Sequence, residues 1–216
     1  MGYDYALRLA READLGAILG LIRGASDWLA AKGTDQWQRP WPTRRERDAR
    51  IRAAILADKT WILTDGDVAA ATITTDWQGR PAPGLPELWD ERALAQPAVY
   101  AHRMVVRREP PYQGQGLGGR LLDWAGRLGR AAYDAAYIRV DVWSTNYDLH
   151  GYYKELGFDK LGTVGEERTA GCPSGALFQK PAAGFADTAA AFAVVSGDAG
   201  RWSARARAAV AVVTEN

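Results

Sequence analysis

Apolar and polar positions follow two different periods in the first third of the chain. Residues 5–10 (YALRLA) alternate, which predicts a short strand. From residue 11 onward the apolar side chains recur at helical spacing, and Gly33 is placed to end that helix. A second helix is predicted over residues 44–57, with apolar residues on one side and a heavily charged opposite side.

The middle of the chain predicts a hairpin followed by an irregular segment. Two β-rich runs flank the turn dipeptide Asp65-Gly66, so we expect a hairpin over residues 60–76. Prolines interrupt residues 77–96, which therefore predict a long excursion. Loops of this length inside a compact domain are usually functional or mobile.

In the remaining pattern, strands and helices alternate before two final strands. The predicted strands cover residues 98–106, 136–143, 159–166 and 175–180, and the predicted helices cover residues 117–132 and 144–158. We expect His150 on the exposed side of the last helix. The residues after 181 are rich in Ala and Val, which predicts a domain over residues 1–180 and a C-terminal extension, 181–216, of unknown structure.

Composition excludes several classes of protein. The chain has 216 residues, 47% of them hydrophobic and 25% charged, so a packed core is expected. A net charge of +1 gives no sign of a nucleic-acid surface, and no apolar run approaches the ~20 residues of a membrane span. The single cysteine, Cys172, excludes an internal disulfide and a Cys-based zinc site, and we expect no metal. Without a signal-peptide pattern, a cytoplasmic location is expected.

The glycine-rich stretch PPYQGQGLGGRLLDWA (residues 110–125) fits two phosphate-binding patterns. Gly114, Gly116 and Gly119 satisfy G-x-G-x-x-G, and Asp141 follows where a dinucleotide fold would place its ribose-binding acid. Seven residues, RREPPYQ, separate Val106 from Gly114, whereas a dinucleotide turn follows its strand almost at once. No run of βαβ units follows either. An NAD(P)-dependent oxidoreductase therefore stays the less favoured alternative.

The second pattern is Q-x-x-G-x-G at Gln113, Gly116 and Gly118. The first N–H groups of a helix have no internal partner, and the helix dipole is positive there. Glycines let the backbone approach phosphate oxygens without Cβ clashes. A strand, this loop and a helix could thus hold a pyrophosphate.

These residues resemble the GNAT superfamily of acyl-CoA-dependent N-acetyltransferases. The family's most diagnostic segment is a strand, Arg or Gln, x-x-Gly-x-Gly or Ala, and a helix, here MVV, QGQGLG and GRLLDWAGRL. A second segment agrees: a strand, Asn146, Tyr153 seven residues later, and Gly157-Phe158. Both motifs lie within residues 100–158, and the element order extends the resemblance over residues 5–180. One departure is a longer loop before Gln113, with Pro110-Pro111 inside it.

The resemblance implies an α+β fold. Its mixed, mostly antiparallel sheet would be splayed between strands 98–106 and 136–143, with helices on both faces. It also implies acetyl-CoA as the cosubstrate, with its pantetheine arm beside Met104, Val105 and Val106 and near Asn146. The pyrophosphate would lie on the loop residues Gln113, Gly114, Gln115, Gly116, Leu117, Gly118 and Gly119.

Acetyl transfer to an amine needs a base, an oxyanion donor and an acid for the thiolate. The resemblance implies Tyr153 as the acid, because the family's tyrosine sits near the thioester sulfur. His102 is a candidate base, since histidine can accept a proton near neutral pH. Strand alternation puts His102 and Arg103 on opposite faces, so only one is expected to face the substrate. Asp76 and Asp141 are reserve candidates.

The acceptor is expected beside the first two helices and the 77–96 excursion. Trp28, Trp37 and Trp89, with Trp41, could line its site, or could only pack the helices. Four acids could bind a cationic amine, namely Asp27, Asp35, Glu87 and Asp90. The expected partner is a small-molecule or peptide amine, neither nucleic acid nor membrane, and a homodimer is possible.

We therefore expect an N-acetyltransferase in which the amine attacks acetyl-CoA directly in a ternary complex. A non-catalytic acyl-CoA-binding module is the alternative. The presence of both Asn146 and Tyr153 argues against it, because a pure binder has no need of a thiol acid.

Overall fold

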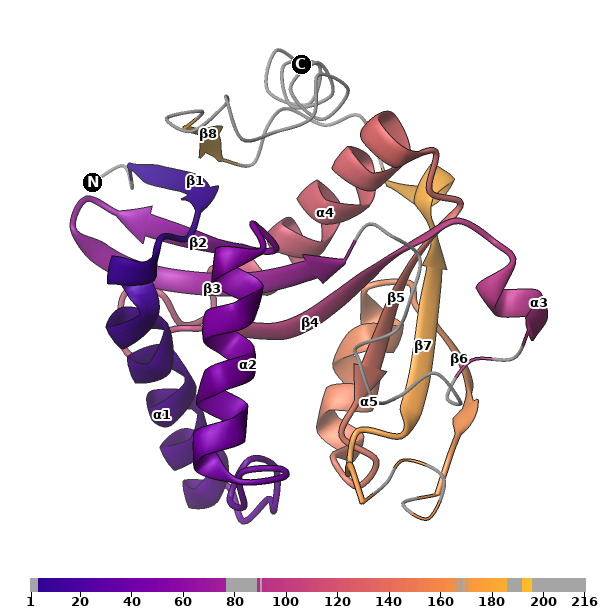
Figure 1. Ribbon diagram of the computed structural model, residues 1–216, viewed down its shortest axis with the longest axis horizontal. Coiled ribbons are helices and arrows are strands. Elements are labelled where there is room, and N and C mark those ends of the chain that lie inside the picture. Colours follow the sequence, from indigo (N-terminus) through magenta and orange to yellow (C-terminus); the bar gives the residue numbers. More distant parts are fainter. Residues whose placement is uncertain are drawn as a thin grey trace.

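The computed structural model describes residues 4–76, 89, 91–165, 167, 169, 171–185 and 192–195 (Figure 1). The strands are β1 Tyr5–Leu9, β2 Thr60–Asp65, β3 Val68–Asp76, β4 Ala98–Val106, β5 Tyr137–Val142, β6 Asp159–Thr163, β7 Ala176–Pro181 and β8 Ala193–Val194. The helices are α1 Leu15–Ala31, α2 Arg44–Leu56, α3 Glu91–Leu94, α4 Leu117–Tyr133 and α5 Tyr147–Glu155, with 3-10 turns η1 Glu12–Asp14 and η3 Ala182–Gly184. The order expected from the sequence is present, with α3, β8 and the 3-10 turns in addition.

The strands form one mixed sheet in the order β6-β7-β5-β4-β3-β2-β1-β8. Neighbouring strands are antiparallel except for the parallel pairs β4–β5 and β1–β8. Helices α1 and α2 cover one face, and α4 and α5 cover the other (Figure 1). Ile18, Ile22, Ile51 and Ile55 are buried under the first face, while Leu121 and Trp124 of α4 are buried under the second. The expected α+β architecture is confirmed.

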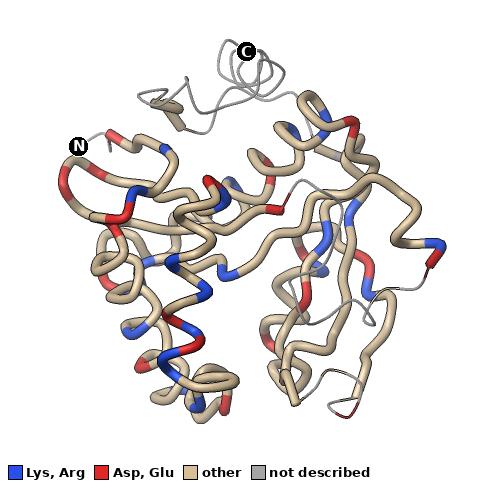
Figure 2. Tube along the Cα trace, viewed as in Figure 1, with Lys and Arg blue, Asp and Glu red and all other residues tan. Residues whose placement is uncertain are grey.

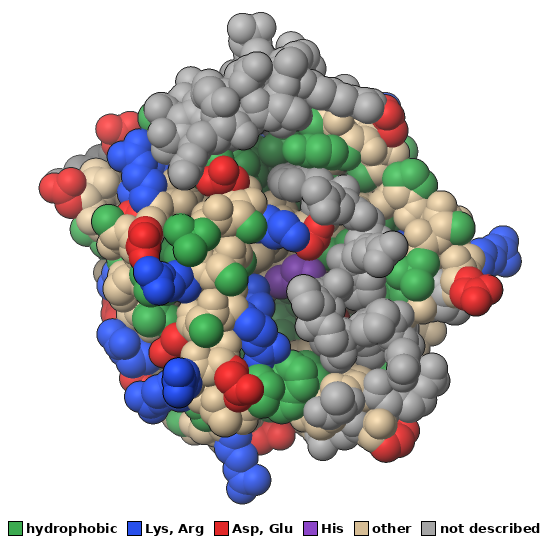
Figure 3. All heavy atoms as spheres, in the orientation of Figure 1, with side chains coloured by type: hydrophobic (Ala, Val, Ile, Leu, Met, Phe, Trp, Pro, Cys, Tyr) green, Lys and Arg blue, Asp and Glu red, His purple; other side chains and the backbone are tan. Residues whose placement is uncertain are grey.

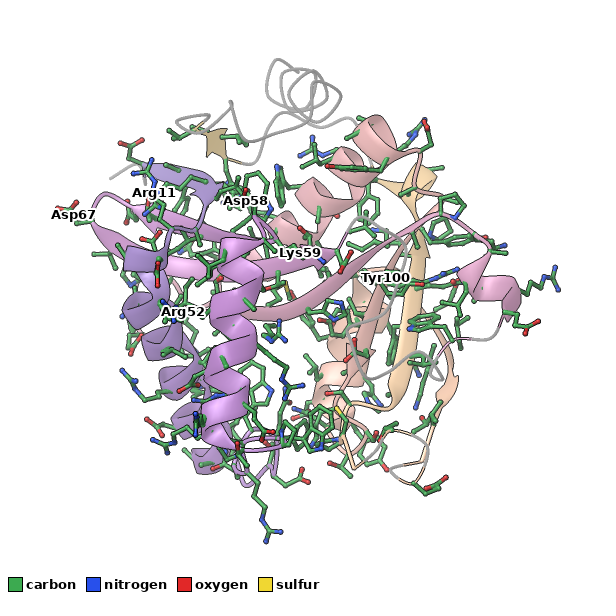
Figure 4. The ribbon with its side chains drawn as sticks, viewed as in Figure 1. Arg11, Arg52, Asp58, Lys59, Asp67 and Tyr100 are labelled. Carbon is green, nitrogen blue, oxygen red and sulfur yellow. The ribbon has the colours of Figure 1, made fainter. Side chains whose placement is uncertain are left out.

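The sheet opens between its two central strands. β4 and β5 pair only at Ala98–Tyr137, Val99–Ile138 and Tyr100–Arg139. Beyond Tyr100 the strands diverge, and Figure 4 places this tyrosine at the junction of β4 with β5 and β7. Arg139 is fully buried there and donates hydrogen bonds to Tyr100 Oη (3.0 Å) and to the carbonyl oxygen of Ala93 (2.6 Å). The splay is thus closed at one end and open at the other.

A β-bulge interrupts β4 on the open side of the splay. Thr72 of β3 pairs with Val105 and Thr74 pairs with His102, so Arg103 and Met104 together oppose one residue of β3. Arg103 has φ +47°, in the left-handed region that non-glycine residues rarely adopt. The bulge breaks the period-two alternation of side chains along β4.

The structure also corrects the expectation for His150 and describes a short part of the C-terminal extension. His150 is buried (5% exposed), and its Nε2–H donates to the carbonyl oxygen of Trp143 at 2.9 Å, so the prediction of an exposed side chain was wrong. The imidazole packs against Phe178 of β7, which a helix pattern alone does not reveal. In the C-terminal extension, β8 pairs with β1, and Phe192 packs edge-on against Tyr5.

Candidate active site

A cavity of about 640 Å³ opens where β4 and β5 diverge. One wall comes from α1, α2 and their connection, and the other from β5, α5 and the segment before β7. β4, the glycine loop and the start of α4 complete it. Figure 3 shows a depression in the α1–α2 face with a histidine side chain at its bottom and basic side chains beside it. Of the two histidines, His102 lines the cavity.

One end of the cavity, here called the glycine-loop end, consists of Gln113, Gly114, Gly116, Leu117, Gly118 and Tyr152. Gly114 and Gly116 have φ of +80° and +65°, in the left-handed region that glycine adopts readily and most other residues avoid. Gly116 is the N-cap of α4, so the N–H groups of the first helical turn have no intrahelical acceptor. Tyr152 Oη lies 2.5 Å from the position of a Cβ on Gly118, so only glycine fits there. The result is a turn of free N–H groups beside the cavity.

Most of the residues expected to hold the cofactor lie together at this end and along β4. Gln113, Gly114, Gly116, Leu117, Gly118, Met104, Val105, Val106 and Asn146 line the cavity. Gln115 and Gly119 do not line it; Gly119 instead lies close to Leu156. Past Tyr100, the edge of β4 that faces β5 is not paired with it, so its backbone groups can pair with an extended ligand. The loop before Gln113 is anchored by Tyr112, which is buried and donates to Asp65 Oδ2 at 3.2 Å.

Asn146 has a structural role as well as a place in the lining. It is the N-cap of α5, where its Oδ1 accepts from the backbone N–H of Leu149 at 3.0 Å. Its Nδ2 donates to Gln36 Oε1 at 2.5 Å. Asn146 therefore positions α5, and with it Tyr153, against the α1–α2 connection.

Tyr153 lines the cavity from α5 and is held by aromatic neighbours. Its ring centroid lies 5.4 Å from that of Phe158 and 5.8 Å from that of Phe178. Burial raises the pKa of the Tyr153 hydroxyl well above its usual range, and the nearby Tyr152 and Asp141 add to the effect. The hydroxyl therefore keeps its proton at neutral pH.

The opposite end of the cavity, here called the histidine end, consists of Arg50, His102, Arg103 and Asp141. His102 Nδ1 and Asp141 Oδ1 are 3.1 Å apart, and the imidazole stacks on Tyr100. Asp141 fixes the imidazole so that Nδ1 carries the hydrogen and Nε2 is the acceptor. Nε2 is buried and has no hydrogen-bond partner among the residues that the structure describes. An unpartnered buried acceptor of this kind is uncommon and calls for a functional explanation.

The bulge turns both His102 and Arg103 toward the cavity. The prediction that only one of them faces it was wrong, because the bulge at Arg103 and Met104 interrupts the alternation directly after His102. Among the described residues, only two acids line the cavity, Asp141 and Asp148, whereas seven basic residues do. The basic residues are Lys32, Arg39, Arg47, Arg50, Arg103, Arg107 and Arg108. Figure 2 shows the concentration of Lys and Arg along α2 and on the neighbouring part of β4.

The sequence profile of the acetyltransferase (GNAT) family matches residues 22–158, more than half of the chain. The chain belongs to the GNAT acetyltransferase family. This membership confirms the expected acyltransferase, with acetyl-CoA as its cosubstrate.

Relatives of this GNAT enzyme agree in sequence and in fold. An uncharacterized N-acetyltransferase, YesJ of Bacillus subtilis (strain 168), is 28% identical over 151 residues, which are 69% of this chain and 78% of YesJ. A GNAT-family acetyltransferase structure from Listeria monocytogenes 4b F2365 has a TM-score of 0.62 at 22% identity, covering 82% of this chain and 94% of that one. The PaiA N-acetyltransferase of Thermoplasma acidophilum, solved in complex with coenzyme A, has a TM-score of 0.59 at 14% identity, covering 82% and 99%.

The expected acceptor residues of the GNAT enzyme are only partly brought together. Trp28, Trp37 and Trp41 line the cavity. Trp89 does not; it is 4% exposed, packs edge-on against Tyr100 and lies under the Arg139 guanidinium.

Neither of the two described acids that were expected to bind a cationic amine, Asp27 and Asp35, lines the cavity. Asp35 Oδ1 accepts hydrogen bonds from Thr145 Oγ1 (2.8 Å) and Trp143 Nε1 (3.0 Å). The Thr145 bond, followed by the Trp143 bond, lowers the pKa of Asp35 despite the opposing effect of partial burial. Asp27 is exposed on α1. Asp76, a reserve candidate for the base, pairs with Lys59 at 2.7 Å. Glu87, Asp90 and most of the expected excursion lie outside the described residues.

Sequence reasoning missed Arg50 and gave Arg103 no role. It considered Asp141 as a reserve base and as the ribose-binding acid of the less favoured dinucleotide fold. Arg50 belongs to the charged side of α2, which a helical pattern assigns to solvent. Nothing in the sequence marks the bulge that redirects Arg103. In the described part of the chain, no group of three or more His, Cys, Asp or Glu side chains is placed to hold a metal ion. Within the same residues, no helix has the length and apolar character needed to cross a membrane.

Proposed function

We propose that this GNAT enzyme transfers the acetyl group of acetyl-CoA to a primary amine of a small molecule, by direct attack in a ternary complex. The observation that carries the proposal is the His102–Asp141 pair at one end of the cavity, with the protonated Tyr153 on the same cavity's lining. These groups have the chemical properties of a base and an acid.

The glycine-loop end would hold the cosubstrate. The free N–H groups of the first turn of α4 and the backbone of Gln113 and Gly114 suit the pyrophosphate. The unpaired edge of β4 from Met104 to Val106 suits the amide groups of the pantetheine arm. A thioester bound in this way would enter the splay between β4 and β5.

The reaction then needs two proton transfers. The neutral amine nitrogen attacks the thioester carbonyl carbon, and its surplus proton passes to His102 Nε2 while Asp141 stabilises the imidazolium. A backbone N–H of β4 near Met104 stabilises the oxyanion. The C–S bond breaks as the intermediate collapses, and the leaving sulfur takes the hydroxyl proton of Tyr153. The products are the N-acetylated amine and free CoA, and return of the His102 proton to Tyr153 through solvent restores both residues for the next turnover.

A small acceptor is favoured by the closure of the cavity on the α1–α2 side. Asp35 and Gln36 tie the connection between these helices to Trp143, Thr145 and Asn146. Trp41 of the same connection lies close to Gly171, in the segment that precedes β7. These contacts close the cavity at the α1–α2 connection, where a long peptide would need an open groove.

The test is release of free CoA from acetyl-CoA across a panel of alkylamines, amino acids, aminoglycosides and peptides. It is run beside thermal-shift measurements with acetyl-CoA, CoA and NAD(P). We expect stabilisation by both CoA forms and thiol release that depends on the amine. Stabilisation by acetyl-CoA with no thiol release on any amine would leave only the binding module, and stabilisation by NAD(P) alone would contradict the proposal.

A further inference from the structure

The histidine end of the cavity carries two arginines that no described acid neutralises. Arg103 forms no hydrogen bond or ion pair with any residue that the structure describes, and its side chain is half-buried in the cavity wall. A guanidinium that loses part of its water without gaining a close opposite charge is unfavourable. Its backbone also has φ +47°, a strained conformation for a residue with a side chain. Strain and unpaired charge at one residue are typical of a site that awaits a ligand.

Arg50 approaches the same place from α2 and is held rigidly. Its guanidinium stacks on the Trp41 ring, 4.7 Å from the ring centroid, and donates to the Trp41 carbonyl oxygen. These contacts use the face and one N–H group of the guanidinium and supply no negative charge. Most of its planar set of donors therefore stays available, already oriented.

Arg50, Arg103, Asp141 and Cys172 all line the cavity, and their charges act on one another. Burial, followed by the charge of Arg50, lowers the pKa of Arg103, and Asp141 opposes the shift. Burial raises the pKa of the Cys172 thiol; to a smaller extent, Asp141 raises it further and Arg50 lowers it. Asp141 Oδ1 is already bonded to His102, so this one carboxylate faces two guanidinium groups and an imidazole. The surplus charge at this end of the cavity is positive.

The phosphates of acetyl-CoA are poorly placed to neutralise this charge. A strand rises about 3.3 Å per residue, so Arg103 lies about 10 Å back along β4 from Val106, and the glycine loop follows only after that. Arg107 and Arg108, which come directly after β4, are closer in sequence to that loop and line the cavity as well. The Arg50–Arg103 pair lies instead beside the base, where the acceptor amine must bind.

We propose that Arg50 and Arg103 form a carboxylate-binding subsite, so that the acceptor is an amine bearing a carboxylate, of the amino-acid type. This inference rests on the proposed function and narrows its acceptor class. A guanidinium matches a carboxylate with two parallel N–H···O bonds, and two guanidinium groups repel polyamines and aminoglycosides. Because His102 and Arg103 are consecutive on the cavity wall, the carboxylate lies only a few bonds from the reacting nitrogen. Trp28, Trp37 and Trp41 offer apolar surface for the remainder of the molecule.

The test compares kcat/KM for amino acids and for their carboxamides, with free CoA as the measured product. The carboxamide has the less basic amine and therefore more of the reactive neutral form, so a preference for the acid must come from recognition of the carboxylate. We expect the acid to be favoured by about 30- to 100-fold, the range of a charge-assisted pair of hydrogen bonds. Arg50→Gln and Arg103→Gln should each bring the acid-to-amide ratio toward one.

Arg47→Gln is the matched control. Arg47 lies one turn before Arg50 on α2 and lines the cavity, but it is paired with Asp48 at 2.6 Å. Its loss should leave the acid-to-amide ratio at the wild-type value. An equal change in the ratio for all three variants would indicate a general effect of cavity charge and would overturn the subsite.

Two further arms separate the inference from the proposed function. Calorimetric titration of the enzyme–CoA complex with an amino acid and with its amide measures binding without turnover, and should show heat of binding for the acid alone. Preference for ethanolamine, a polyamine or O-phosphoethanolamine over amino acids would overturn the carboxylate subsite while the acetyltransferase stands. Absence of CoA release with every amine would contradict the proposed function, and the calorimetry would still decide whether the subsite binds a carboxylate.

Discussion

The glycine-loop end and the histidine end of the cavity are built in different ways. The glycine-loop end consists largely of backbone N–H groups from one continuous segment, positioned by a helix start and by glycines. The histidine end consists of side chains from α2, β4 and β5, brought together by the sheet and by one bulge. The first is suited to a ligand part that is always the same, and the second to a part that can differ between enzymes.

The comparison predicts that single changes at the histidine end affect turnover and leave cosubstrate binding intact. His102→Gln removes the base, so kcat/KM for the amine should fall by about 10²- to 10³-fold, as is usual for such groups. The Kd of acetyl-CoA, measured by calorimetry, should change less than about threefold. A comparable loss of acetyl-CoA affinity would show that the two ends are not separate.

Tyr153, which lines the cavity from α5, should affect the chemical step. Tyr153→Phe keeps the ring packing and removes the proton, so kcat should fall by up to about 10²-fold with little change in acetyl-CoA affinity. Tyr152→Phe is the control, because that hydroxyl lies beside Gly118 and should affect KM for acetyl-CoA more than kcat. Since burial raises the pKa of Tyr153, its ionisation should cause no loss of kcat up to pH 10.

The glycine-loop end should respond to added volume. A Cβ at Gly118 would lie 2.5 Å from Tyr152 Oη and 3.3 Å from Met104 Cε, so Gly118→Ala should raise KM for acetyl-CoA by about tenfold at similar kcat. Gly151→Ala, where a Cβ meets nothing within 4 Å, should leave KM unchanged. Adding Tyr152→Phe to Gly118→Ala should restore part of the affinity, and failure to do so would place the clash elsewhere.

The smallest predicted effect concerns His150, which ties α5 to the carbonyl oxygen of Trp143. Burial lowers the pKa of His150, and Lys160 and Lys154 add to the shift against the Trp143 hydrogen bond. The folded protein therefore disfavours protonation, so stability is full above the unfolded value of about 6.5 and decreases as the pH falls below it. We expect a decrease of roughly 1 kcal/mol or less between pH 7 and pH 5. Melting curves of His150→Gln should lack this dependence, whatever the absolute loss of stability.

The sequence predicted the parts of the site that depend on neighbouring residues. Short spacings were enough to point to Gln113, Gly114, Gly116, Gly118, Asn146 and Tyr153, which all line the cavity, because a loop and a helix start are local structures. The histidine end depends on packing between distant segments. Alternation misplaced Arg103 because no sequence pattern marks a bulge, and helical periodicity assigned Arg50 to solvent because it cannot show that a cavity lies next to α2. For the same reason, the sequence predicted that His150 is exposed and that Asp35 could bind the amine.

The bonds from Asp35 and Gln36 to the start of α5 have a consequence for engineering. They make the connection between α1 and α2, residues 32–43, a module with two fixed attachment points, one at Trp143 and Thr145 and one at Asn146. Between Trp37 and Trp41 the segment can be exchanged to admit acceptors of other shapes, provided that the aspartate and the glutamine are retained. Replacement segments without these two residues would lose the hydrogen bonds that hold Asn146, the N-cap of α5, and with it the position of Tyr153. We expect such variants to lose activity as well as the original specificity.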